Sequence, residues 1–112
     1  MMRLYSETEV VARVEGLTVA RLRAFVAADC VRPSEAEGEV GYAEADLARL
    51  ALAAELAQDF DLDPDASAMV LGLVDQIHGL RHALRRLGDA VGAEPEEIRT
   101  RVRLRLREPA GG

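Results

Sequence analysis

Residues 6–28, which read SETEVVARVEGLTVARLRAFVAA, decide the fold of the first part of the chain. Ser6 and Glu9 have the spacing of a capping box, in which the serine caps the amide of position 9 and the glutamate returns to the amide of position 6. A short helix is expected after Ser6, with Gly16 as its C-terminal stop. Thr18 then caps a second helix. The stretch predicts two short helices joined by a tight turn.

The two helices are expected over about residues 7–14 and 19–28, each with one apolar face. The inward residues are predicted to be Val10, Val11 and Val14 in the first helix and Val19, Leu22, Phe25 and Val26 in the second. Two helices in this relation are typical of a helix-turn-helix. Residues 31–42 contain Pro33, Gly38 and Gly41, which block a long helix and favour a hairpin or wing.

Two longer helices are predicted downstream. Residues 44–60 are apolar around most of the helix circumference, which is usual for a buried helix. The next helix begins at Pro64, with Asp63 as its cap and Asp65 in its first turn, where acids suit the helix dipole. These patterns predict a mainly α protein.

The helix after Pro64 carries a heptad stripe of apolar residues over more than three repeats. Met69, Leu71 and Val74 widen its first half, which is expected to pack on the helix-turn-helix. About 28 residues give a length of roughly 42 Å, so the distal end is expected to need a partner helix. A homodimer is predicted through Leu73, Ile77, Leu80, Leu84 and Leu87. Alternatively, residues 98–106 fold back over the stripe. A parallel and an antiparallel pair both remain open.

The last segment, residues 93–112, is rich in arginine and fits two structures. Its alternation of arginine with apolar residues from 101 to 107 suits a strand, whereas Ile98, Val102 and Leu106 have helical spacing. Pro95 followed by two glutamates favours a helix. The predicted organisation is a winged helix-turn-helix-like domain over 1–60, an interaction helix over 61–92 and this tail.

Composition limits the partners of the chain. Among 112 residues there are 14 cationic residues, all arginine, and 20 acidic ones, for a net charge of −6. Residues 1–80 hold 6 arginines and 15 acids, giving −9; residues 81–112 hold 8 and 5, giving +3. An acidic chain is a poor default partner for nucleic acid.

A single cysteine fits a reducing compartment, and no apolar run suits a membrane span or a signal peptide, so a cytoplasmic protein is expected.

No pattern of catalytic or metal-binding residues stands out. His78 and His82 share a helix face with Asp75 one turn earlier, a spacing that can hold zinc, but they lie outside the stripe and no HExxH motif occurs. The acids from Asp59 lack the glycine and glutamate that a calcium loop requires. Nucleophile–base pairs and phosphate loops are missing. We expect no enzyme activity, no small-molecule substrate, no cofactor and no metal.

Charged residues suggest two kinds of interface. The acids Asp59, Asp61, Asp63 and Asp65, together with Asp75, are read as a docking patch for a basic partner, or else as a solvated linker and helix cap. A DNA-reading surface would use Arg21, Arg23 and Arg32. However, the predicted wing carries Glu35, Glu37 and Glu39, which would repel phosphate and are equally available to a basic partner.

The order of motifs resembles the MerR-type winged helix-turn-helix. The matching segments are Glu9-Val10-Val11-Ala12, Gly16-Leu17-Thr18, Leu22-Arg23, Val31-Arg32-Pro33, Gly41-Tyr42 and Asp46-Leu47-Ala48-Arg49-Leu50. The chain to about residue 91 is also similar to the CbpM family of chaperone modulators. That resemblance rests on Leu62-Asp63-Pro64, Leu71-Gly72-Leu73-Val74-Asp75-Gln76-Ile77 and Leu80-Arg81-x-x-Leu84-Arg85-x-Leu87.

These resemblances imply a function. CbpM-like proteins bind the J-domain of a DnaJ-like, CbpA-type co-chaperone and block its work with the Hsp70 protein DnaK, and Asp75 matches an acidic position of that family. The alternative that the scaffold implies is a MerR-type DNA-binding transcriptional regulator. We expect a non-enzymatic J-domain modulator, because the acidic body complements the positively charged helix of a J-domain.

Overall fold

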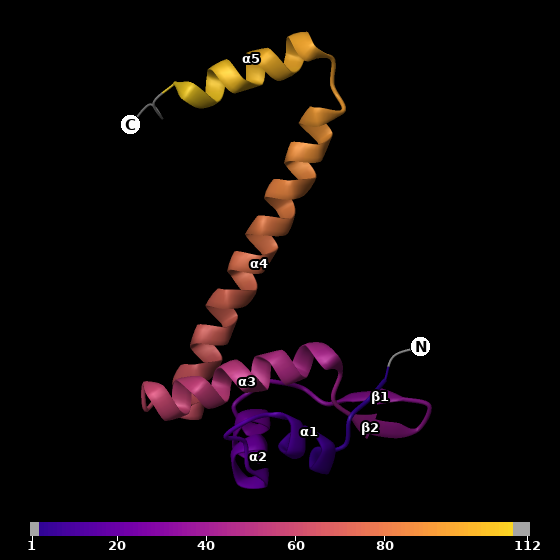
Figure 1. Ribbon diagram of the computed structural model, residues 1–112, viewed down its shortest axis with the longest axis vertical. Helices are drawn as coiled ribbons and strands as arrows, with labels where there is room; N and C mark the ends of the chain where they lie inside the picture. Colours follow the sequence, from indigo (N-terminus) through magenta and orange to yellow (C-terminus); the bar gives the residue numbers. More distant parts are fainter. Residues whose placement is uncertain (1–2, 109–112) are drawn as a thin grey trace. The chain divides into compact units, whose positions relative to one another are not determined.

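The computed structural model describes residues 3–108, and within them the protein is mainly helical (Figure 1). The elements in chain order are α1 (Glu7–Arg13), α2 (Val19–Ala27), β1 (Ser34–Ala36), β2 (Glu39–Gly41), α3 (Glu44–Asp59), α4 (Pro64–Gly92) and α5 (Glu96–Arg107). The predicted mainly α class is confirmed. The chain forms two compact units, an N-terminal unit up to Val74 and a C-terminal unit from Asp75.

The N-terminal ends of the first two helices follow the predicted caps. The Ser6 hydroxyl accepts a hydrogen bond from the Glu9 amide at 3.2 Å, and the Ser6 amide donates to the Glu9 carboxylate at 3.1 Å. The bond from the Ser6 amide lowers the pKa of Glu9. Thr18 caps α2 by accepting from the Arg21 amide at 3.1 Å. The predicted stop at Gly16 is wrong, because α1 ends earlier, at Arg13, with Val14 as an extended C-cap. Gly16 has a φ of 78° in the turn that leads to α2.

The core of the N-terminal unit joins α1, α2, α3, the start of α4 and the residues on either side of the hairpin. Its fully buried members include Val10, Leu22, Phe25, Cys30, Leu50 and Leu71. The predicted burial of two residues is wrong: Val19 is 40% exposed and Met69 is 74% exposed. Because α2 buries the face that carries Leu22 and Phe25, Val19 in its first turn points toward solvent.

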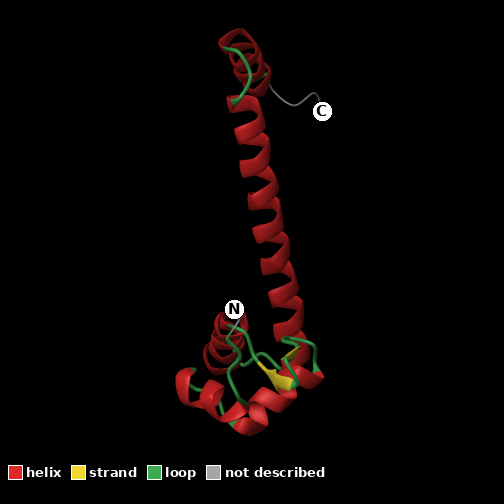
Figure 2. Ribbon diagram, turned by 90° about the vertical axis from the view of Figure 1, so that its right-hand side faces the viewer, coloured by secondary structure: helices red, strands yellow, loops and turns green. Residues whose placement is uncertain are grey.

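β1 and β2 form an antiparallel hairpin, drawn in yellow in Figure 2. Glu37 and Gly38 at its tip have φ values of 53° and 80°, as a type I′ turn needs at both central residues. The base of the hairpin is fixed by Tyr5 and Tyr42, whose backbones exchange hydrogen bonds of 2.7 and 2.8 Å. The hairpin expected over 31–42 is therefore present, and the N-terminal segment pairs with its last residue.

The predicted burial of α3 around most of its circumference is wrong. Only Leu50, Ala53 and Ala54 are fully buried, and the other leucines of the helix are half-buried. α3 covers the core with one face, because the unit offers no second layer that could cover its opposite face. Phe60, which follows α3, is 70% exposed.

α4 starts where the sequence predicts. The Asp63 carboxylate accepts from the Ala66 amide at 2.7 Å, and Pro64 is the first helical residue. Leu71 and Ser67 are the residues of the helix that are fully buried within the described chain, and both belong to its first ten positions. The first part of α4 therefore completes the core of the N-terminal unit.

The C-terminal unit consists of the rest of α4 and of α5. The helical interpretation of the tail is confirmed: residues 96–107 form one helix, with two glutamates in its first turn and Arg105 and Arg107 in its last. Both placements suit the helix dipole. No helix in residues 3–108 is long and apolar enough to cross a membrane.

Candidate functional site

The acidic segment, residues 59–65, links α3 to α4 and places its charges in solvent. Asp59, Asp61 and Asp65 are exposed, and Asp61 has a φ of 54°, which turns the chain sharply at that point. Asp63 differs from the others because its carboxylate caps α4. Phe60 lies between Asp59 and Asp61 and is also exposed. The segment thus exposes an aromatic side chain next to two acidic residues in the sequence.

The hairpin is a second acidic surface. Glu35, Glu37 and Glu39 are all exposed. Val40 pairs directly with Glu35 in the register of the hairpin, so the two side chains share one face, and Val40 is 68% exposed. Like the acidic segment, the hairpin combines carboxylates with an uncovered apolar side chain.

The three arginines of the predicted DNA surface have partners within the protein. Arg23 donates to the Glu7 carboxylate at 3.0 Å, and Arg21 donates to the Gly16 carbonyl at 3.0 Å. Arg32 lies 3.7 Å from the Asp29 carboxylate. Two of the three guanidinium charges are therefore offset by neighbouring acids.

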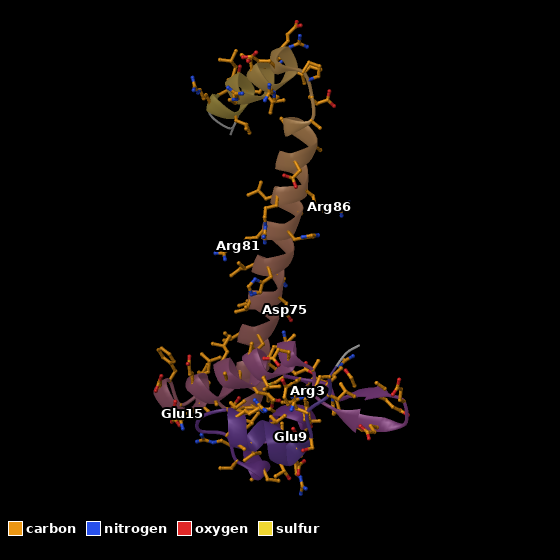
Figure 3. The ribbon with its side chains drawn as sticks, turned by 45° about the vertical axis from the view of Figure 1, so that its right-hand side comes forward. Arg3, Glu9, Glu15, Asp75, Arg81 and Arg86 are labelled. Atoms are coloured by element: carbon orange, nitrogen blue, oxygen red, sulfur yellow. The ribbon has the colours of Figure 1, made fainter. Side chains whose placement is uncertain are left out.

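Asp75 lies at the start of the C-terminal unit, whereas residues 59–65 belong to the N-terminal unit. Figure 3 shows Asp75 on α4, followed along the helix by Arg81 and Arg86, which leave it on different sides. His78 and His82 are exposed on the same stretch of α4. The character of α4 thus changes from acidic to basic along its length.

The predicted dimer residues form an uncovered apolar stripe on α4. Leu73, Ile77, Leu80, Leu84 and Leu87 are between 47% and 71% exposed. α5 lies beside the distal end of this stripe, at Leu84 and Leu87, but it leaves all five side chains exposed. Single exposed leucines are common, but an aligned series along one helix face is typical of a protein interface.

A groove of about 680 Å³ lies between the last turns of α4 and one face of α5. The sequence patterns did not predict this groove. It is lined by Leu84, Leu87, Gly88, Val91 and Gly92 of α4 and by Arg99, Val102, Arg103 and Leu106 of α5. The helical spacing of Val102 and Leu106 was the sequence pattern that could have predicted the apolar face of α5. The sequence did not predict the turn at residues 93–95, which brings this face of α5 close to α4.

Cys30 is buried, and its thiol donates to the Pro64 carbonyl at 3.3 Å. Burial raises the pKa of this thiol, so Cys30 is protonated at neutral pH. Its surroundings suit a core residue that joins the end of α2 to the start of α4.

Comparisons with protein-family models, with curated proteins and with solved structures found no match to this chain.

Proposed function

We propose that this protein is a non-enzymatic, cytoplasmic modulator that binds the J-domain of a DnaJ-like, CbpA-type co-chaperone and blocks its work with Hsp70. In this proposal the N-terminal unit is a MerR-like winged helix-turn-helix that serves as a protein-binding module. The proposal rests on one observation above all: the surface that such a scaffold would present to DNA carries three exposed glutamates on its hairpin, and two of its three arginines lie beside carboxylates.

The ion pairs of the N-terminal unit support this choice over DNA binding. Phosphate contacts need cations that are free to replace counterions. Arg23 is engaged by Glu7 and Arg32 lies beside Asp29, while the hairpin adds three exposed glutamates. A duplex approaching this face would meet more carboxylates than arginines.

The same charges suit a basic protein partner. Residues 3–74 hold 14 acidic residues and 6 arginines. Complementary charge raises the association rate and the specificity, but affinity comes mainly from a few buried anchors. Phe60 is the best-placed anchor, because it is exposed between Asp59 and Asp61. The proposed mechanism is occlusion, in which the acidic segment covers the positive J-domain surface that Hsp70 needs.

The test is fluorescence anisotropy of a labelled J-domain titrated with the full chain at low and near-physiological salt. We expect binding that weakens with salt and that unlabelled random duplex DNA does not displace. Retention of DNA without J-domain binding would instead support the alternative, a MerR-type regulator. Substitution of Arg21 and Arg23 by alanine should then abolish DNA binding.

A matched pair of variants tests which acidic surface is used. One variant combines Asp59→Asn, Asp61→Asn and Asp65→Asn, leaving the cap at Asp63 intact. The control combines Glu35→Gln, Glu37→Gln and Glu39→Gln and removes the same charge. We expect the first to weaken J-domain binding about fivefold or more, about 1 kcal/mol, and the control to have a smaller effect. The reverse order would place the site on the hairpin.

The proposal includes a homodimer through the exposed stripe of α4. Leu80→Glu together with Leu84→Glu should give a folded monomer by light scattering, since both side chains are exposed and neither is part of the core. An unchanged mass would contradict this interface.

A further inference from the structure

The groove of about 680 Å³ lies within the C-terminal unit, which supplies every residue that lines it. Its walls are apolar, with Leu84, Leu87 and Val91 on α4 and Val102 and Leu106 on α5. Leu106 is 78% exposed, so the described chain does not cover this wall. Sites that hold small molecules are typically apolar hollows of about 300–1,000 Å³, and the groove falls within that range.

The side of the groove on α4 contains a glycine inside a helix. Gly88 lies four residues before the end of α4, and glycine weakens a helix interior because its flexible backbone must be fixed. A Cβ atom added at Gly88 or at Gly92 would meet no other part of the described chain within 4 Å. The helix therefore leaves open space in the groove that a side chain would fill.

Two arginines, Arg99 and Arg103, supply the charge of the groove, and no acidic residue of the described chain lines it. The Nε atom of Arg99 is buried and has no hydrogen-bond partner among residues 3–108. Arg101, which does not line the groove, instead has its guanidinium 3.5 Å from the Glu97 carboxylate. A guanidinium can bind a carboxylate through two parallel hydrogen bonds. An anion that drew Arg99 into the groove would break no hydrogen bond of its Nε atom.

The charge and the length of the groove decide what kind of occupant fits. α5 carries five arginines and two glutamates, so a second copy of α5, or the basic J-domain of the proposed function, would bring positive charge to positive charge. From Leu84 to Val91 the groove follows about 10 Å of α4. That is short for a stable protein interface, which takes about 800 Å² from each partner. A single alkyl chain that ends in an anionic group matches the length, the apolar walls and the arginines.

We propose that this groove binds a free fatty acid in its ionised form. The alkyl chain lies between the leucines of α4 and Val102 and Leu106 of α5, over the open space at Gly88, and the carboxylate accepts hydrogen bonds from Arg99 and Arg103. No nucleophilic or acidic side chain of the described residues lines the groove, so the fatty acid is a ligand that is not altered. One copy supplies every contact, so the inference does not rest on the proposed function.

Equilibrium dialysis of the full chain against radiolabelled decanoate, below its micelle concentration, tests the site. Hexanoate is four methylenes shorter and should compete at least about fiftyfold more weakly, because each buried methylene adds to the affinity. Decyltrimethylammonium has a similar apolar tail and the opposite charge, and it should compete at least about tenfold more weakly than unlabelled decanoate. Absence of decanoate binding, or equal competition by the cation, would overturn the proposal.

A matched pair of glycine variants tests whether the ligand occupies the groove. Gly88→Leu fills the open space, whereas Gly79→Leu makes the same change at another glycine of α4 that has open space around it and lies outside the groove. Both changes favour a helix, and circular dichroism verifies that each variant is folded. We expect Gly88→Leu to weaken decanoate binding about tenfold or more and Gly79→Leu to change it less than about twofold. Equal effects would contradict the site.

A second matched pair tests the contact with the carboxylate. Arg99→Gln with Arg103→Gln removes the two charges that line the groove, and Arg101→Gln with Arg105→Gln removes two charges of α5 that do not. We expect the first pair to weaken decanoate binding about tenfold or more, and the control less than about threefold. Equal losses would show general attraction to a basic helix in place of a specific site.

The predicted homodimer is separated from the ligand site by a variant of the stripe. Leu84 and Leu87 belong to both features, whereas Ile77 and Leu80 lie outside the groove. A chain with Ile77→Ser and Leu80→Ser should bind decanoate within about twofold of the wild type. Loss of binding in this variant would place the ligand in the dimer interface and overturn a site within one copy. J-domain binding is read independently in the anisotropy titration.

Flotation with phosphatidylglycerol vesicles distinguishes a free fatty acid from a lipid surface. A membrane presents its acyl chains below a layer of headgroups, so the groove is expected to take single chains from solution and the vesicles are expected to retain no protein. Retention by vesicles without binding of free decanoate would show that α5 recognises a lipid surface, and would overturn the inference.

Discussion

Replacing Ser67 by alanine should stabilise the protein, although Ser67 is completely buried in the core. The side chain lies in the first ten residues of α4, and its hydroxyl oxygen has no hydrogen-bond partner within residues 3–108. The amide of the same residue is satisfied by the Asp63 carbonyl at 2.9 Å, so the substitution removes an unsatisfied polar atom and leaves the backbone bond in place.

The expected gain follows from two contributions of the same sign. A buried hydroxyl without a partner costs about 1–3 kcal/mol. Alanine also favours a helix interior over serine by up to about 0.7 kcal/mol. Loss of the packing contacts of the oxygen offsets part of this, which leaves a net increase in the free energy of unfolding of about 1–2 kcal/mol. The melting temperature should rise by about 4–8 °C for each kcal/mol.

Thermal and urea unfolding followed by circular dichroism measure this change, and Ser6 supplies the control. Ser6→Ala is the same chemical substitution at a hydroxyl that caps α1, so it should lower the free energy of unfolding by about 1 kcal/mol. Opposite signs at the two serines are expected. A neutral or destabilising Ser67→Ala would refute the reasoning and show that the hydroxyl is hydrogen-bonded in solution.

Three other substitutions or conditions test the description of the N-terminal unit. Leu71→Ala, which empties a fully buried site, should cost about 2–5 kcal/mol in urea unfolding, whereas Leu73→Ala, two residues on and exposed, should cost less than about 1 kcal/mol in the monomer. Because the pKa of Glu9 is lowered in the folded protein, its ionised carboxylate stabilises the fold. This stabilisation is complete at pH values well above the ordinary pKa of 4.5 and is lost as the pH falls through the lowered value. An unfolding series against pH in which Glu9→Gln showed the same acid sensitivity as the wild type would contradict that role. Cys30 should react with Ellman's reagent far more slowly in the native protein than in urea, since its thiol is buried and its pKa is raised.

The features that the sequence predicted well are local. The Ser6–Glu9 box, the Thr18 cap and the Asp63–Pro64 helix start each depend on residues within one turn of one another. Their side chains offer the same hydrogen bonds wherever the helix packs, so spacing alone identifies them.

The features that the sequence did not predict depend on distant contacts. Arg23 is paired with Glu7, sixteen residues earlier, and no periodicity shows that pairing. Val19 and Phe60 continue apolar patterns, yet both are exposed because neighbouring elements do not reach them. The groove of α5 required the turn that joins it to α4. Each of these outcomes is set by tertiary packing, which overrides a helical pattern.

The burial of Leu71 has a practical consequence for dividing the chain. The predicted boundary at residue 60 would cut between the core and one of its fully buried members, since the compact N-terminal unit runs to Val74. A fragment that ended at residue 60 would lack Leu71 and leave an apolar hole in the core, and would be prone to aggregate. During synthesis the core of the same unit cannot be completed until about seventy residues have left the ribosome. Its first three helices can pack fully only once the beginning of α4 is available.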